Sequence, residues 1–171
     1  MEIAIEIIGI LGIIASIVSF QCKEHKNILI MRTANEMLFA LQYLLLGAYT
    51  GMAMNLVGST RNMIFTKTVK ENKGTRICVI LFSILFTAFG LLTWQGPRSI
   101  LIIIAKVLST LAYSSKNTTL VRGLVFVTST AWLIYNACVG STAGVINEGF
   151  AIISIIVGTL RYDVIPRLKR A

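Results

Sequence analysis

Hydrophobic residues occur along this chain in seven long runs separated by short polar segments. The runs cover residues 3–20, 28–47, 51–67, 77–94, 98–114, 119–139 and 142–161. Each is close to the roughly 20 apolar residues that an α-helix needs to cross the hydrocarbon core of a bilayer. The pattern therefore predicts an all-α membrane protein with seven transmembrane helices.

Composition favours a single membrane domain over residues 1–171. Of the 171 residues, 56% are hydrophobic and only 13% are charged, which is too apolar for a soluble domain. The seven runs use most of the chain, so no room remains for a soluble domain or a long linker. In a soluble protein the net charge of +9 would suggest nucleic-acid binding. Here the basic residues lie mostly between hydrophobic runs, where they set topology, and we predict no nucleic-acid partner.

The positions of these basic residues predict an orientation. If successive helices alternate in direction, one side of the membrane carries Lys23, Lys26, Lys67, Lys70, Lys73, Arg76, Lys116, Arg161, Arg167, Lys169 and Arg170. The other side carries Arg98 alone. Because cytoplasmic loops are enriched in Lys and Arg, we expect the N-terminus outside the cell and the C-terminus in the cytoplasm, with the protein in the plasma membrane.

Residues 13–65 reappear, without a gap, as residues 106–158. A shift of 93 positions aligns Ser16 with Ser109, Phe20 with Tyr113, Lys23 with Lys116, Phe39 with Trp132, Gly47 with Gly140 and Gly51 with Gly144. Self-similarity at a fixed spacing indicates a duplicated structural unit. We therefore predict triple-helix repeats at residues 3–67 and 98–161, with a linker helix at 77–94.

The linker helix decides how the two repeats are related. A unit of three spanning helices ends on the side of the membrane opposite to its start, so a direct tandem copy would be inverted. One extra span restores the direction, which makes the halves parallel and relates them by an axis along the membrane normal. The predicted architecture is three plus one plus three helices.

Each repeat joins its second and third helices by a short turn bounded by glycines. These are Gly47 and Gly51 in the first copy, and Gly140 and Gly144 in the second. A tight reversal of the chain needs either a positive φ or a close approach of the backbone, and glycine permits both.

Two charged residues lie near the middle of predicted spans. Glu36 and Lys106 are each about eight positions into their hydrophobic runs, where a charge costs about 2.5–3.5 kcal/mol even on permissive insertion scales. They could form a central polar site that contacts a ligand, or a structural ion pair between the two halves, and the sequence leaves both readings open. Arg32 lies four residues before Glu36, on the same helical face.

Arg61 and Arg122 lie within two turns of the predicted cytoplasmic side. Long basic side chains can extend from this depth to the membrane surface. We therefore favour contact with lipid phosphates over a role at an anionic substrate or a gate.

The chain resembles a known group of membrane proteins. The three-plus-one-plus-three pattern, the external N-terminus and the stretch Phe20-Gln21-Cys22-Lys23 resemble the SWEET and PQ-loop superfamily. Phe20-Gln21, Leu46-Gly47-Ala48 and the spacing of Gly51, Asn55 and Arg61-Asn62 are more closely similar to the Imp-YgjV family of bacterial inner-membrane proteins. The resemblance covers nearly the whole chain. It implies two triple-helix bundles and, for the superfamily, passage of small solutes such as sugars.

The resemblance also implies a binding site. In sugar-carrying relatives, asparagines of the third helices and aromatic residues of the second helices line a central cavity, because hydroxyl-rich ligands need amide hydrogen bonds and an aromatic face. By position, the substrate-binding candidates are Asn55, Asn147, Glu148, Phe39 and Trp132.

One departure from the superfamily affects the expected motion. SWEET-like proteins are similar in having a proline in the first helix of each unit, which permits bending. The corresponding residues 14–21 and 107–114 contain none. Any change of shape must then come from glycines such as Gly9 and Gly12, or from rigid-body rocking of the halves.

Two functions remain open from the sequence. The first is a transporter of a small solute, such as a sugar or another small polar metabolite, with a central site between the repeats. The alternative is a non-transporting membrane protein with a lipid-binding, regulatory or assembly role, for which the basic loop containing Lys67, Lys70, Lys73 and Arg76 could bind membrane lipids or a partner. No nucleophile, phosphate-loop or metal-ligand motif is present, so we predict no enzyme, no metal and no cofactor. The sequence also leaves a homo-oligomer open.

Overall fold

A computed structural model describes residues 2–22, 25–71, 75–115, 118–160 and 165. This part of the chain forms seven α-helices: α1 (Glu2–Gln21), α2 (His25–Leu45), α3 (Tyr49–Glu71), α4 (Thr75–Leu92), α5 (Arg98–Ser114), α6 (Thr118–Val139) and α7 (Thr142–Thr159). The all-α prediction is confirmed, and each helix coincides with a predicted hydrophobic run to within a few residues. Seven basic residues used to predict the orientation lie outside the described residues: Lys23, Lys73, Lys116, Arg161, Arg167, Lys169 and Arg170.

Four of these helices are long and apolar enough to cross a membrane. The qualifying segments are Glu2–Ser19, Thr75–Leu92, Thr119–Val139 and Thr142–Thr159. The helices α2, α3 and α5 fall short because α5 has only 17 residues and because polar and ionisable residues interrupt α2 and α3. These three helices carry the charges that meet inside the bundle.

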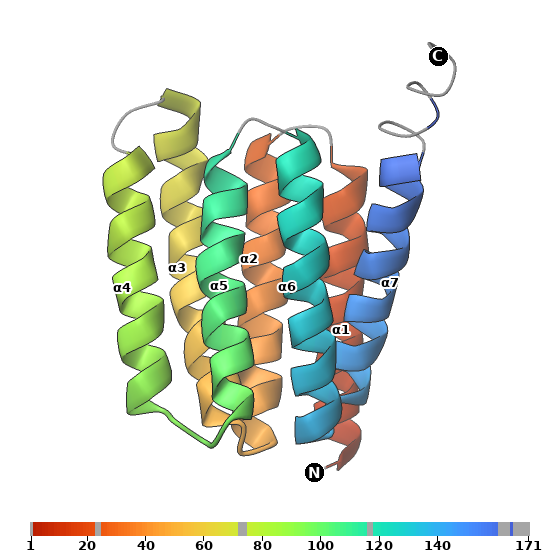
Figure 1. The fold of residues 1–171 in the computed structure, drawn as a ribbon. Coiled ribbons are helices and arrows are strands. Elements are labelled where there is room, and N and C mark those ends of the chain that lie inside the picture. Colours follow the sequence, from red (N-terminus) through yellow and green to blue (C-terminus); the bar gives the residue numbers. More distant parts are fainter. Residues whose placement is uncertain (1, 23–24, 72–74, 116–117, 161–164, 166–171) are drawn as a thin grey trace.

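The helices form two rows, with α4 beside one end of them (Figure 1). In one row α2 packs against α1 and α3, and in the other α6 packs against α5 and α7. The rows meet where α1 packs against α7 and where α3 packs against α5, while α4 contacts both α3 and α5. A shift of 93 residues exchanges α1 with α5 and α3 with α7, so it converts one of these contacts between rows into the other. The packing between the rows thus follows the duplication in the sequence.

The outer surface of the bundle is apolar and its interior is rich in polar side chains. Large hydrophobic residues are exposed along α1, α4 and α7, among them Ile3, Ile7, Ile77, Ile84, Ile153 and Val157. Polar residues with an exposed fraction of 4% or less include Gln42, Arg61, Asn62, Lys106 and Asn136. A bilayer favours an apolar outer face and tolerates charges only where they are buried against partners. The distribution is that of a bundle surrounded by lipid.

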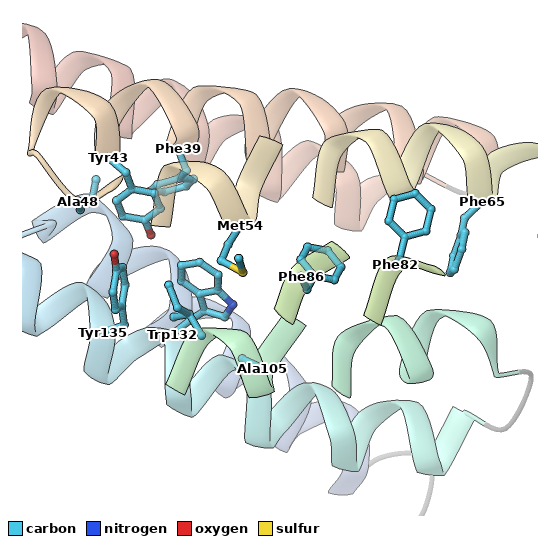
Figure 2. Packing of buried hydrophobic residues seen from close by; sticks show 12 residues of the cluster. Phe39, Tyr43, Ala48, Met54, Phe65, Phe82, Phe86, Ala105, Trp132 and Tyr135 are labelled. Atoms are coloured by element: carbon cyan, nitrogen blue, oxygen red, sulfur yellow. The ribbon is translucent and has the colours of Figure 1, made fainter. Parts of the chain in front are cut away.

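An aromatic cluster joins the two rows near the end of the bundle where the chain begins (Figure 2). Tyr43 of α2 stacks on Trp132 of α6 with ring centroids 6.0 Å apart, and Tyr135 meets these two rings edge-on at 5.9 and 5.6 Å. Phe39, one turn before Tyr43, extends the cluster. Aromatic pairs of this kind contribute about 0.5–1.5 kcal/mol each beyond the burial of their area. The cluster therefore links α2 to α6 through side chains that meet between the two rows.

The glycines that bound the two turns serve both of the predicted purposes. Gly47 lies two residues after the end of α2 and Gly140 directly follows α6, and their φ angles are +70° and +74°. Gly51 and Gly144, in the first turns of α3 and α7, are sites of close approach. A Cβ atom at Gly51 would lie 2.9 Å from the ring of Tyr135, and one at Gly144 would overlap the side chain of Asn136.

We predict that Gly140→Ala lowers the thermal unfolding temperature of the purified protein in detergent. The space around Gly140 is open, so the effect should come from the backbone alone, since a residue with a Cβ costs roughly 1–2 kcal/mol in the left-handed conformation. Gly123→Ala is the matched control, because Gly123 also has open space around it but lies within α6, where alanine is the better helix former. Equal effects of the two substitutions would contradict this role for Gly140.

Candidate functional site

The carboxylate of Glu36 joins three helices near the middle of the bundle. The ammonium group of Lys106 in α5 donates to Glu36 Oε1 over 3.0 Å, and Arg61 Nη2 in α3 donates to the same oxygen over 3.4 Å. Glu36 belongs to α2, so the cluster links the first repeat to the second. The sequence predicted Lys106 as a partner of Glu36, but it did not predict Arg61 as one.

Arg61 is completely buried, and its guanidinium points into the bundle. Its Nη1 donates to the hydroxyls of Ser109 and Thr110, both over 3.0 Å, and its Nε and Nη2 donate to Asn62 Oδ1. The predicted contact with lipid phosphates is therefore wrong for Arg61. The physical reason is that α5 supplies hydroxyl acceptors at the depth of Arg61, so the side chain gains bonded partners by turning inward.

Aromatic rings complete the surroundings of the buried cations. The Lys106 nitrogen lies 5.3 Å from the ring centroid of Trp132, and the guanidinium carbon of Arg61 lies 4.9 Å from that of Tyr113. The ring of Phe86 is 5.5 Å from the guanidinium carbon of Arg61. A cation over an aromatic face gains about 0.5–2 kcal/mol, with the larger values in desolvated sites. These rings offset part of the cost of burying two positive charges.

Gly58 of α3 provides the space that the ion cluster occupies. A Cβ atom at Gly58 would overlap the Glu36 carboxylate and would lie 2.7 Å from the Lys106 nitrogen. In the second repeat the aligned position is Ala151, and the position aligned with Glu36 is Ser129. The smaller residue thus occurs in the copy that carries the carboxylate.

A cavity of about 100 Å³ lies between the two rows beside this cluster. All five substrate-binding candidates line it: Phe39, Asn55, Trp132, Asn147 and Glu148. The remaining lining includes Glu36, Arg61 and Lys106, together with Arg32, Tyr43, Tyr113 and Asn136. The structure therefore brings the candidate residues and the central charges to one cavity, with contributions from both repeats.

Arg32 and Glu148 hold charge at the wall of the cavity outside the Glu36 cluster. Arg32 is half-buried, and its Nη1 donates to the Tyr113 hydroxyl over 3.1 Å. Glu148 accepts a hydrogen bond from the side-chain amide of Asn147 over 3.2 Å. Arg32 belongs to α2 and Glu148 to α7, so a positive and a negative group reach the cavity from different rows.

Hydrogen bonds join the two repeats beside the cavity, toward the end of the bundle where the chain begins. The Tyr43 hydroxyl donates to Asn136 Oδ1 over 2.6 Å, and these residues occupy aligned positions in the two copies. The hydroxyl of Tyr135 accepts from the backbone of Gly51 over 2.9 Å, and Gln42, which aligns with Tyr135, accepts from the Ser141 hydroxyl over 2.9 Å. Each second helix thus binds the start of the opposite third helix.

The family model for Imp-YgjV, described as a bacterial inner membrane protein, matches residues 3–164. The chain belongs to the Imp-YgjV family. No curated protein and no solved structure matches it. Family membership agrees with the apolar surface and the membrane-crossing helices, and it identifies the membrane as the bacterial inner membrane. The central cavity of this Imp-YgjV protein therefore lies within a bundle of inner-membrane helices.

We predict that Gly58→Ala destabilises this Imp-YgjV protein by about 1–3 kcal/mol, the usual range for an overpacked interior. The added methyl group would displace the Glu36 carboxylate from Lys106. Denaturant unfolding in detergent would measure the loss. Gly149→Ala serves as the control, because a Cβ atom at Gly149 meets nothing within 4 Å. A Gly58→Ala protein as stable as the control variant would show that the cluster is not tightly packed.

Proposed function

We propose that this Imp-YgjV protein transports a small polar solute through the cavity between its two triple-helix repeats. The observation that carries the proposal is the convergence of Asn55, Asn147, Glu148, Phe39 and Trp132, from both repeats, on one cavity beside buried charges. Amide groups can bind polar groups of a solute, and aromatic walls can pack against its apolar part. Placing such polar and charged groups inside a membrane bundle costs free energy, and side chains of this kind are typical of solute pathways.

We further propose that all seven helices cross the membrane in a SWEET-like arrangement of three, one and three, with the N-terminus outside. The helices α2, α3 and α5 carry their charges on faces that meet inside the bundle, so those charges need not contact lipid. The exchange of the α1–α7 and α3–α5 contacts by the duplication supports parallel halves. The excess of basic residues on one side supports the orientation.

The motion we propose is a rocking of the two halves against each other. A Cβ atom at Gly12 would lie 2.8 Å from the ring of Phe39, and one at Gly9 would overlap Gln42 and Ala143. Glycine is needed at these two positions because α1 packs closely against its neighbours, so the glycines do not require a hinge in α1. To rock apart at the end of the bundle where the chain begins, the two halves would have to break the Tyr43–Asn136 hydrogen bond and its neighbours between the repeats.

Site-directed labelling tests the topology. After replacement of the free cysteines Cys22, Cys78 and Cys138, we expect a cysteine at Thr142 to react with an impermeant maleimide in intact cells. A cysteine at Thr119 should react only after permeabilisation. Both threonines are exposed in the first turn of a helix, at opposite ends of the bundle (Figure 1). The reverse pattern would overturn the orientation, and labelling of both sites from outside would overturn the number of spans between them.

Flux measurements test the transport proposal. Purified protein in liposomes should accelerate uptake of at least one solute from a panel of labelled sugars, amino acids and organic acids. Asn55→Ala and Asn147→Ala should each lower that uptake about fivefold or more, since a hydrogen bond to the solute contributes on the order of 1 kcal/mol.

Thr87→Ala should leave uptake unchanged, because Thr87 is exposed on α4 and its hydroxyl bonds to the backbone of Ser83 in the same helix. If no solute in the panel enters faster than into empty liposomes, transport is contradicted. The alternative of a lipid-binding, regulatory or assembly role would then be favoured.

A further inference from the structure

The charges that line the cavity are divided between its two walls. Lys106 and Arg61 both contact Glu36, and the charge of Glu36 offsets one of these two positive charges, that of Lys106 at the shorter distance. Arg32 and Arg61 belong to α2 and α3 in one row of helices, whereas Glu148 belongs to α7 in the other row. The lining outside the Lys106–Glu36 pair is therefore positive on one side and negative on the other.

From this division we propose that the solute is a small zwitterion with one carboxylate and one ammonium group, of the size of alanine. The proposal rests on the transport function proposed above. A zwitterion would direct its carboxylate toward Arg32 and its ammonium group toward Glu148. Each charge in a low-dielectric cavity would then meet its opposite, which a neutral sugar could not provide.

The positions of the side chains indicate which groups would bind. Arg61 and Lys106 have exposed fractions of 0% and 4% and are held by the Glu36 cluster, whereas Arg32 is only half-buried. A guanidinium has five N–H donors in a planar array that matches a carboxylate. Arg32 is therefore the arginine placed to receive the carboxylate of a solute.

On the opposite wall, Glu148 and the neighbouring amide of Asn147 offer oxygen acceptors for an ammonium group. Between the walls lie Phe39 and Trp132, which suit a short apolar side chain. The 100 Å³ of space compares with the cavity of about 150 Å³ that admits benzene, so it suits a solute of about six non-hydrogen atoms, such as alanine, better than a hexose with about twelve.

Alanine and lactate separate the role of the ammonium group, because lactate carries a hydroxyl in its place and otherwise has the same shape. In liposomes containing the full-length protein, we expect uptake of labelled L-alanine to exceed that of L-lactate by about tenfold or more, as expected for a charge-to-charge contact in a partly polar interior. D-glucose should enter no faster than into empty liposomes.

Substitutions at Glu148 and at Arg32 then test the two charged contacts separately. Glu148→Gln should lower alanine uptake about tenfold and leave lactate uptake equal or higher, while Glu148→Asp should retain the preference for alanine. Arg32→Gln should lower uptake of both solutes. Thermal unfolding of each variant in detergent, without L-alanine and at a series of L-alanine concentrations, reports binding independently of flux. The wild type should be stabilised by L-alanine and not by D-glucose.

The outcomes distinguish this inference from the transport proposal. Faster uptake of glucose or lactate than of alanine by the wild type would overturn the zwitterion and leave transport standing. Unchanged alanine preference in Glu148→Gln would also overturn it, since the ammonium contact would then lie elsewhere. If no solute moves and alanine does not stabilise the protein, both proposals fail.

Discussion

The rest of the structure depends on the ion pairs that the Glu36 carboxylate forms with Lys106 and Arg61. Without it, Lys106 and Arg61 would be two buried cations with no counter-charge in contact among the described residues, and the loss of one partner from a buried ion pair costs about 3–5 kcal/mol. Because Lys106 and Arg61 belong to α5 and α3, the carboxylate on α2 also ties the two repeats together. Gly58 leaves the space for this contact, and the cavity lies directly beside it.

Most of the fold could be predicted because its determinants are local. The length of each apolar run sets the helices, and the glycines at the turns follow from the backbone geometry of a tight reversal. The proximity of Glu36 and Lys106 was also foreseeable, since opposite charges at the same depth in a membrane have few other partners. The resemblance to sugar-carrying relatives, applied by position to the two copies, likewise selected five residues that the structure gathers at one cavity.

The rest depends on how each helix is rotated, which the sequence pattern does not fix. The depth of Arg61 allows its side chain to extend to the surface or to turn inward, and the choice rests on Ser109 and Thr110, almost fifty positions further along the chain. The alignment pairs Tyr43 with Asn136 as equivalents but does not reveal that they touch. Such contacts arise where side chains of α2 and α6 meet between the two rows of helices.

A double-mutant cycle on Glu36 and Lys106 tests the central role of this ion cluster most directly. Glu36→Gln and Lys106→Gln should each destabilise the protein in detergent, and combining them should recover part of the sum of the two losses. Recovery should be incomplete because Arg61, 3.4 Å from Glu36, would still lack its counter-charge. Additive losses in the double variant would contradict the account, since they would mean that the two side chains do not interact.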